Sequence, residues 1–481
     1  MSKAQAILLT LIGYSVALLA IGIWANRRTR DHTDFFLGGR ALGPLVAAIS
    51  ASASSSSAWT LLGVSGAAYV WGLSALWLFP ATVSGFLINW FWVGPRLMRL
   101  SHAEKTVTLT EFVAGPGSYD LRLTIMRVAS AIVVFSFVFY IAAQFQAAGH
   151  AFASTFDLSM EISILIGGSV LLIYTLIGGF WAVSVTDTLQ GILMAVTAIV
   201  LPLGALVSLG GFEQLLTGLA AGGDADTLSL TGPHSGFMGL AFVMGTLGIG
   251  LGYPGQPHVV NRYMALRDET ALKQARVIAI GWAVIVYSGM LLLGLCARVL
   301  LDGIGDTEQA FFVVANNLLP PVVAGVMIAA VLSAIMSTAD SQLLVAASSA
   351  SYDWNNRSAG SRTSLTSYRV MVFVISALAI LIAVFLPQDI FSRVLFAWHA
   401  VGSAFGPLVF LRIAGFDVRP GAKLATLIAG FGLTVLFHVL PDVAGLEPVT
   451  GFLRQGPGDF AERILPLLIA LAIAWQGRTG R

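Results

Sequence analysis

Charged residues are scarce in this sequence, and cysteine is almost absent. Only 10% of the 481 residues are charged and 57% are hydrophobic, whereas soluble domains average about 25% charged residues. The single Cys296 excludes an intramolecular disulfide and any multi-cysteine metal site. No Walker A loop, no H-E-x-x-H zinc spacing and no basic tract with interleaved aromatics occurs. The sequence therefore argues against an ATP-driven pump, a zinc site and nucleic-acid binding.

Long apolar runs fill the chain instead. Each is long enough to cross about 30 Å of hydrocarbon, so the sequence predicts an all-α polytopic membrane protein with a single transmembrane domain over residues 1–481 and no soluble domain. Thirteen transmembrane helices are expected, at residues 4–25, 42–70, 73–98, 125–152, 159–179, 184–209, 235–255, 272–301, 319–350, 367–386, 390–413, 421–440 and 462–476.

The basic residues predict the orientation of these helices. With the N-terminus outside and the C-terminus in the cytoplasm, 21 of the 26 lysines and arginines fall in inside loops. The long connector 210–237 has none and falls outside. Cytoplasmic loops carry an excess of Lys and Arg, so we expect a multi-pass protein of the plasma membrane with this orientation.

Two of the expected helices contain sequences that favour a break. Ala48–Trp59 is rich in serine, and Gly245–Pro257 reads G-T-L-G-I-G-L-G-Y-P-G-Q-P. Serine competes for backbone hydrogen bonds, and Gly and Pro are poor helix formers. Close helix packing is the alternative explanation. However, these are the second and seventh helices, and interrupted helices at matching positions of two halves indicate a transporter binding site. We therefore expect two inverted five-helix repeats, helices 2–6 (residues 42–209) and 7–11 (residues 235–413), after a leading helix (4–25) and before trailing helices (421–476).

The stretch Ser333–Leu344, S-A-I-M-S-T-A-D-S-Q-L-L, is the most informative part of the chain. Helical spacing places Ala334, Ser337, Thr338 and Ser341 on one face, and Asp340 lies one turn from Ser337. A carboxylate at bilayer depth costs about 2.5–3.5 kcal/mol. Hydroxyl, carboxylate and carbonyl oxygens suit a hard cation. We favour an ion site over the alternative that the hydroxyls only assist helix packing.

Asp187 is a second intramembrane carboxylate, in G-G-F-W-A-V-S-V-T-D-T-L-Q. A carboxylate near a helix N-terminus is stabilised by about 0.3–1 kcal/mol. That effect alone would explain an acid here, so the sequence leaves Asp187 open between a helix-dipole role and an ion site.

Several motifs together resemble the sodium/solute symporter family, closest in pattern to the sodium/proline symporters. They are D-F-F-L-G-G-R-A-L-G-P from Asp34, A-W-T-L-L-G-V-S-G-A-A-Y from Ala58, L-I-G-G-F-W-A-V-S-V-T-D-T-L-Q from Leu176, G-L-G-Y-P-G-Q-P-H from Gly250, and M-S-T-A-D-S-Q-L-L from Met336. The resemblance implies a leucine-transporter-like fold and sodium-coupled symport of a small organic solute, most simply an amino acid such as proline.

The resemblance also implies site residues. A sodium ion between helices 2 and 9 would be bound by Ala53, Ser56, Ala334, Ser337 and Thr338. A second sodium site would use Asp187, Ser337, Asp340 and Ser341. The solute would lie at the helix breaks, near Ser57, Trp59, Tyr140, Gln144, Tyr253 and Pro257. Co-transported sodium, the solute and the lipid bilayer are the expected partners, with no obligatory protein partner.

The chain departs from the proline-symporter pattern at several positions. Sodium/proline symporters carry an aspartate at the position of Ser55 and a tryptophan at the position of Ile249. Gln144 and Gln146 replace a glycine-rich patch. These differences leave open a proton-coupled symporter of another solute, such as a carboxylate, sugar or vitamin. A transporter-like sensor would need an output domain, which we do not expect here. An intramembrane enzyme would need a nucleophile–base pair or metal ligands, and neither is evident.

Overall fold

The computed structural model describes residues 3–26, 37–176, 180–222, 225–301, 303–354, 365–386, 388–442 and 457–479. Its regular structure in these residues is helical, apart from an isolated bridge (Leu42–Leu266) and one antiparallel ribbon of β1 (Asp417–Val418) and β2 (Arg478–Thr479). The first half contains α1 (Lys3–Asn26), η1 (Gly38–Arg40), α3 (Pro44–Ser55), η2 (Trp59–Gly63), α4 (Val64–Trp71), η3 (Gly72–Trp77), α5 (Leu78–Leu87), η4 (Ile88–Val93), α6 (Gly94–Glu104), α7 (Leu109–Ala114), α8 (Tyr119–Phe156), α9 (Met160–Thr175), α10 (Phe180–Leu209), α11 (Phe212–Ala221) and η5 (Ala225–Leu228). The second half contains α12 (Gly236–Leu247), η6 (Gly248–Gly255), α13 (Pro257–Met264), α14 (Glu269–Leu300), η7 (Thr307–Gln309), α15 (Ala310–Leu318), α16 (Pro321–Ser348), η8 (Ser349–Asp353), α17 (Leu365–Phe385), α18 (Ile390–Ile413), α19 (Pro420–Val439), η9 (Leu440–Asp442), α21 (Pro457–Arg463) and α22 (Leu465–Gln476).

Every one of the thirteen predicted spans contains helix in the described residues. Ten helices are long and apolar enough to cross a membrane by themselves. The numbers differ because one continuous helical run, Trp59–Glu104, covers parts of two predicted spans. In addition, the helices in the predicted spans 159–179 and 462–476, Met160–Ile173 and Leu465–Gln476, are too short to be counted among the ten. The prediction of an all-helical polytopic protein is confirmed.

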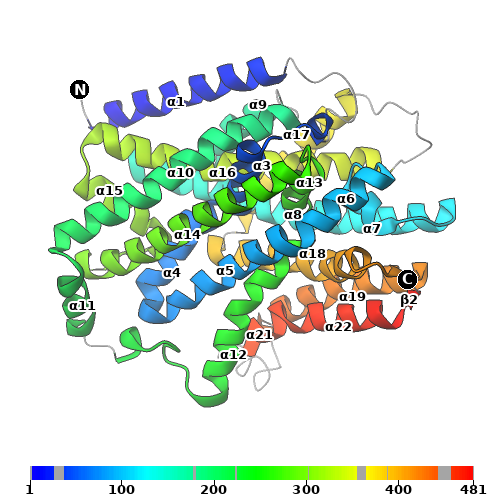
Figure 1. Cartoon of the computed structure of the whole chain (residues 1–481). Helices are drawn as coiled ribbons and strands as arrows, with labels where there is room; N and C mark the ends of the chain where they lie inside the picture. Colours follow the sequence, from blue (N-terminus) through cyan, green and yellow to red (C-terminus); the bar gives the residue numbers. More distant parts are fainter. Residues whose placement is uncertain are drawn as a thin grey trace.

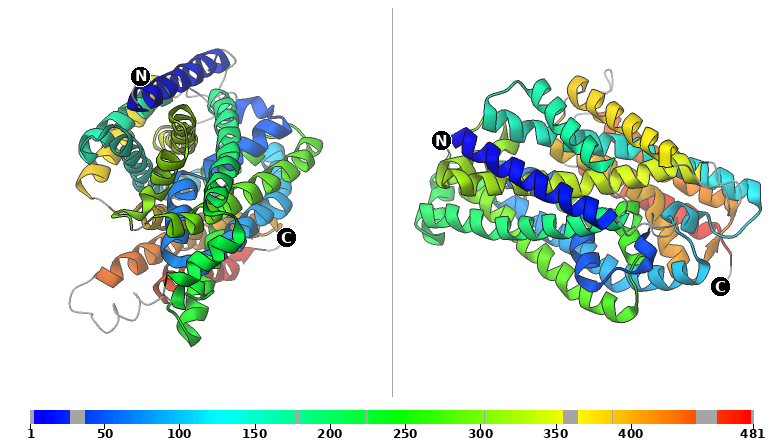
Figure 2. Two further views of the ribbon diagram at one scale, coloured as in Figure 1. Left: turned by 90° about the vertical axis from the view of Figure 1, so that its left-hand side faces the viewer. Right: turned by 90° about the horizontal axis from the view of Figure 1, so that it is seen from above.

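Most of the long helices run in one general direction, and the N- and C-termini lie at opposite ends of the bundle (Figure 1). The leading helix α1 lies on the outside, as the views from the end and from above also show (Figure 2). It packs against α10 and α16. The ribbon of β1 and β2 joins the end of the chain to the turn between α18 and α19.

Two helices form the centre of the bundle. In α16 every residue from Met327 to Ser348 is buried. In the most apolar stretch of α18, 94% of the residues are buried, compared with 39% in that of α10. A helix that is hydrophobic all round is buried by protein or faces lipid. The polar residues of α16 therefore lie inside the protein, where each needs a partner.

The helix 2 break is shorter than the serine run predicts. The helix α3 continues through Ser55, and the chain leaves helical geometry at Ser56, with φ −117° and ψ 71°. Ser50 and Ser54 direct their hydroxyls to another helix, where they donate hydrogen bonds to Asp187. Because these hydroxyls have a tertiary partner, they do not compete with the helical backbone.

The predicted break in helix 7 is confirmed. The helix α12 ends at Leu247, a tighter turn of helix, η6, covers Gly248–Gly255, and α13 begins at Pro257. Glycine is needed here because other backbone comes close. A Cβ atom on Gly250 would lie 2.4 Å from the carbonyl oxygen of Ala81, and one on Gly255 would lie 2.8 Å from Gly402.

Candidate ion and solute site

The end of α3 meets the middle of α16. The carbonyl oxygen of Ala53 lies 3.3 Å from Ser337 Oγ and 3.5 Å from Thr338 Oγ1, and both hydroxyls donate to it. Ser337 Oγ also lies 3.2 Å from the carbonyl oxygen of Ala334, and the Ser56 N–H donates to the Ala53 carbonyl. Carbonyls at a helix C-terminus lack helical partners and carry partial negative charge. The five residues expected at the first sodium site thus lie together where such a charge would attract a cation.

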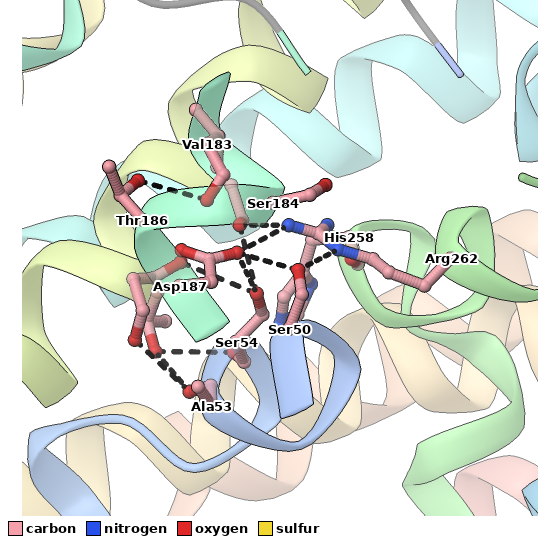
Figure 3. Close-up of polar contacts among 12 residues, drawn as sticks. Ser50, Ala53, Ser54, Val183, Ser184, Thr186, Asp187, His258 and Arg262 are labelled. Carbon is pink, nitrogen blue, oxygen red and sulfur yellow. Dashed lines mark hydrogen bonds and ion pairs between the residues drawn. The ribbon is translucent and has the colours of Figure 1, made fainter. Parts of the chain in front are cut away.

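Asp187 lies beside this region and pairs with an arginine (Figure 3). Its Oδ2 atom accepts from Ser50 Oγ at 2.8 Å, from Ser54 Oγ at 3.2 Å and from Arg262 Nη2 at 3.0 Å. Asp187 is completely buried, and Arg262 is 1% exposed. Since α10 begins at Phe180, Asp187 lies beyond the first turn, where the helix dipole no longer explains a carboxylate. Its charge is instead balanced by Arg262.

Ser341 connects this pair to α16. Its hydroxyl oxygen lies 2.5 Å from Arg262 Nη2 and 3.0 Å from Ser54 Oγ. Asp340, the next residue towards the N-terminus, faces a different neighbour, because its Oδ1 atom is bonded to the Thr175 hydroxyl of α9. The other oxygen of Asp340 has no partner among the described residues. Three of the four residues expected at the second sodium site thus lie on α16, and Asp187 of α10 is connected to Ser341 through Ser54 and Arg262.

Four of the expected solute residues meet where helix 2 is broken. Tyr140 donates its hydroxyl hydrogen to Ser57 Oγ at 3.3 Å, and the Trp59 N–H donates to the same oxygen at 3.1 Å. Gln144 Oε1 accepts from the backbone N–H of Ala58 at 3.1 Å. Trp59 Nε1 and Gln144 Nε2 are buried without a partner among the described residues. The break therefore offers two unused hydrogen-bond donors beside aromatic rings.

Tyr253, in the break of helix 7, is connected to the break of helix 2 by Tyr287 of α14. Tyr287 Oη lies 3.3 Å from Tyr253 Oη, 3.1 Å from Ser56 Oγ and 3.3 Å from Thr60 Oγ1. The Tyr253 ring also packs edge-on against Trp398 of α18, with ring centroids 4.7 Å apart. The two helix breaks are thus joined by hydroxyl contacts and covered by aromatic side chains.

Pro257 is not part of this aromatic group. It starts α13 and, with Asn261, lines a small pocket between α7, α13 and the end of α16. Thr108, Thr110, Ser348 and Ser349 line the other walls. The structure thus places Pro257 on a mainly apolar pocket, which Val107, Leu109, Leu344 and Val345 also line, at the end of the bundle that holds α6 and α7.

A loop covers the opposite end of the helix breaks. Glu308, in η7, accepts the backbone N–H groups of Ile390 at 3.0 Å and Phe391 at 2.9 Å. The Phe391 ring lies 5.4 Å from the Trp59 ring between centroids. The pKa of Glu308 is raised to about 7, chiefly by burial. The two N–H bonds lower the pKa by less than burial raises it, and the neighbouring charges of Asp389 and Asp306 add a smaller increase. This carboxyl therefore holds the start of α18 in place beside Trp59.

Sequence reasoning missed Arg262 and Tyr287. Arg262 is one of the 21 basic residues expected in inside loops, and this expectation is wrong for it, because it lies in α13 and is buried. Its position five residues after the G-Q-P break, in a chain with two intramembrane acids, was the available indication. Tyr287 lies in an ordinary apolar helix, and nothing in the local sequence distinguishes it.

Comparisons with known proteins agree with this architecture. The family model described as "Sodium:solute symporter family" matches residues 35–428. The osmoregulated proline transporter OpuE of Bacillus subtilis (strain 168) is 32% identical, over 97% of this chain and 94% of that protein. The sodium/proline symporter of Salmonella typhimurium is also 32% identical, over 92% of this chain and 91% of that protein.

Solved structures share the fold. The substrate-bound outward-open state of a Na+-coupled sialic acid symporter matches with a TM-score of 0.77 at 18% sequence identity, over 98% of this chain and 96% of that chain. A nucleobase-cation-symport-1 family transporter, Mhp1, matches with a TM-score of 0.57 at 13% identity, over 93% of this chain and 95% of that one. At these identities the likeness concerns the leucine-transporter-like fold. With the family model, the relatives and the fold in agreement, this chain belongs to the sodium/solute symporter family and is a sodium-coupled solute transporter, not an enzyme.

Proposed function

We propose that this transporter imports a small amino acid, with proline as the first candidate, together with sodium. The proline transporters among its relatives are 32–34% identical over most of this chain. Around Ser57, Tyr140 and Trp59, aromatic rings lie beside Trp59 Nε1 and Gln144 Nε2, two donors without a partner among the described residues, a combination that suits a compact solute with one charged end. One sodium ion moving down a membrane potential supplies about 2.3 kcal/mol per 100 mV.

The contact of the Ala53 carbonyl with Ser337 and Thr338 is the observation that carries this proposal. We assign the first sodium site to Ala53, Ser56, Ala334, Ser337 and Thr338. An ion bound there would join α3 to α16, the end of a broken helix to the central helix. Such an ion favours the conformation in which the two helices are close, and that preference is what coupling requires.

Uptake of radiolabelled proline into proteoliposomes, with and without a sodium gradient, tests this proposal. Uptake driven by sodium and inhibited by excess unlabelled proline supports it. Thr338→Ala removes one proposed ligand and should raise the sodium concentration for half-maximal uptake by roughly tenfold or more. Thr338→Ser keeps the hydroxyl and is the matched control. Unchanged sodium dependence in both Thr338→Ala and Ser337→Ala would contradict the assignment, and another solute competing better than proline would change the substrate.

The departures from the proline-symporter pattern each have a local role. Ser55 Oγ donates back to the Ser52 carbonyl at 3.0 Å. Gln146 Oε1 accepts from Arg393 Nη1 at 3.0 Å. The Ile249 carbonyl accepts from Trp398 Nε1 at 3.2 Å, so the tryptophan ring near this break comes from α18. These contacts are compatible with an amino acid substrate, because none of them uses the donors Trp59 Nε1 and Gln144 Nε2.

We also propose the second sodium site at Asp187, Ser337, Asp340 and Ser341, the N-out and C-in orientation, and the repeats at residues 42–209 and 235–413. The two carboxylates have different partners: Asp187 contacts Ser54 and Arg262, whereas Asp340 contacts Thr175. A cation between them would neutralise a charge that burial makes costly.

Proton coupling is a second candidate, and one observation favours it. The Thr175 hydroxyl lies 2.9 Å from the Leu171 carbonyl oxygen and is also bonded to Asp340. A hydroxyl has one hydrogen and a carbonyl only accepts. Both bonds are therefore satisfied together when Asp340 carries the hydrogen. An acid pulse outside proteoliposomes in sodium-free buffer separates the candidates, because a sodium-only symporter shows no uptake under that condition.

A further inference from the structure

We propose that Arg262 is a tethered cation that competes with sodium for Asp187 and Ser341, and so couples ion binding at the second site to the position of α13. This inference rests on the second sodium site proposed above. The guanidinium Nη2 lies 3.0 Å from Asp187 Oδ2 and 2.5 Å from Ser341 Oγ. Two of the four residues of that site, Ser341 and Asp187, are thus already in contact with a positive charge; Asp187 and Arg262 are shown in Figure 3.

Charge balance makes the two cations alternatives. Asp187 is completely buried, and Arg262 is 1% exposed. In such surroundings a carboxylate needs a positive partner, and two cations on one carboxylate repel each other strongly. Sodium can therefore occupy Asp187 and Ser341 only after the guanidinium has moved away, and the guanidinium can return when sodium leaves.

The ion pair is built in a way that permits exchange. All three donors to Asp187 meet at Oδ2, while Oδ1 has no partner among the described residues. The arginine thus uses one carboxylate oxygen and does not form the stronger two-bond pair that Arg–carboxylate contacts often adopt. The free oxygen gives an incoming ion a first contact as the guanidinium moves away.

The remaining contacts of Arg262 connect the proposed ion site to α13, the second half of the broken helix 7. Its Nε atom donates to Ser50 Oγ of α3 at 3.1 Å, and its Nη1 atom donates to the His258 carbonyl within α13. The helix α13 is the half of helix 7 after the break at η6, and a discontinuous helix can move its two halves separately. The pocket lined by Pro257 and Asn261 lies along α13. Arg262 therefore holds α13 to α3, α10 and α16 when sodium is absent and releases it when sodium binds.

Sodium titration of purified protein, read by thermal shift, tests this competition without a transport assay. A ligand that binds only the folded state stabilises it by RT ln(1 + L/Kd), where L is the free ligand concentration, so the melting temperature at a series of sodium concentrations gives an apparent Kd, here called the sodium midpoint. Arg262→Gln removes the competing charge and should lower the sodium concentration at the midpoint by about tenfold or more. Arg276→Gln, on α14 near Trp90, is the matched control and should keep the parental midpoint. An unchanged or higher midpoint in Arg262→Gln overturns the inference.

A double-mutant cycle identifies the site of the effect. In an Asp187→Asn background, Arg262→Gln should no longer change the sodium midpoint, because the contested carboxylate is gone. An equally large change in that background overturns the inference. If Arg262→Gln does not fold, Arg262→Lys replaces it: the shorter ammonium keeps the charge but reaches Asp187 and Ser341 less well, so its midpoint should also fall, and a parental midpoint counts against the proposal.

The parental protein separates this inference from the proposed function. Absence of any sodium-dependent shift in the parental protein, with no sodium-driven uptake, counts against sodium symport itself. A normal parental shift with no decrease in midpoint for Arg262→Gln counts only against the competing role of Arg262.

Discussion

The hydroxyl oxygen of Tyr287, on α14, lies 3.1 Å from the hydroxyl oxygen of Ser56, the first residue after α3. The same tyrosine lies 3.3 Å from Tyr253 Oη in η6. One side chain from an unbroken helix therefore contacts both broken helices. A movement of the backbone at either break would therefore alter a hydrogen bond of Tyr287.

Tyr287→Phe tests this bridge. The change keeps the ring but leaves the hydroxyls of Ser56, Thr60 and Tyr253 without their shared partner. An unmet buried hydrogen bond costs about 1–3 kcal/mol, so the KM for the solute should rise roughly 5-fold or more. Uptake kinetics in proteoliposomes, normalised to folded protein, measure it. Tyr69→Phe is the matched control, and a parental KM in Tyr287→Phe would remove the bridge from solute recognition.

Asp340→Asn separates an ion-binding role from a structural one. Asparagine can still bond the Thr175 hydroxyl, so a purely structural Asp340 would tolerate it, whereas an ion ligand would not. We expect the Hill coefficient for sodium to fall towards one, with folding largely preserved. Thr175→Val is the counterpart, because it removes the bond to Asp340 and keeps the carboxyl. If Asp340→Asn retains the parental sodium curve and Thr175→Val impairs folding, Asp340 is structural.

Glu308 predicts a dependence on outside pH. Its pKa is about 7 where it clamps α18, and opening the loop to water would return it towards about 4.3. Between these values the closed arrangement binds a proton that the open one releases, so acid favours closure. From pH 8 to pH 6 closure should gain about tenfold, and uptake should slow where opening limits the rate.

Two variants check this pH effect. Glu308→Gln cannot titrate and should lose this part of the dependence on outside pH. Glu213→Gln, on the exposed helix α11 at the same end of the bundle, should keep the parental profile. Uptake that accelerates in acid through Glu308 alone would mean that the open arrangement binds the proton more tightly, contrary to the burial seen here.

Cysteine labelling tests the orientation. In a Cys296→Ser background, Ala221→Cys at the end of α11 should react with an impermeant thiol reagent added outside intact cells. Ala103→Cys in α6 should react only after the membrane is opened. Both positions are exposed in the structure. Labelling of Ala103→Cys but not Ala221→Cys in intact cells would reverse the orientation.

Apolar length, together with glycine, proline and serine content, located the spans and both breaks from the sequence, because these properties act locally along the chain. The extent of α3 was not predictable in this way. Its serines remain helical because Ser50 and Ser54 have a partner in Asp187, more than 130 residues away. The burial of Arg262 was unpredictable for the same reason. In the sequence, an arginine indicates the end of an apolar run, and Arg262 is buried because it pairs with the distant Asp187.

The solute region shows a similar limit. The resemblance to the symporter family indicated Ser57, Trp59, Tyr140 and Gln144, and these four lie together. It also indicated Pro257, which lies apart from them on another pocket. Motif matching identifies positions along the chain. The packing of the helices decides which of these residues lie together in space.

The leading helix α1 has one more consequence. Most of its side chains face outward, including Leu9 and Val16 at 59% and 60% exposure, yet Tyr14 Oη lies 2.5 Å from Ser333 Oγ of α16. Ser333 directly precedes Ala334. One helix thus touches the hydrocarbon of the bilayer on one side and the helix of the proposed sodium ligands on the other. Membrane thickness, which sets the tilt of such a helix, therefore has a direct mechanical path to the ion-binding residues.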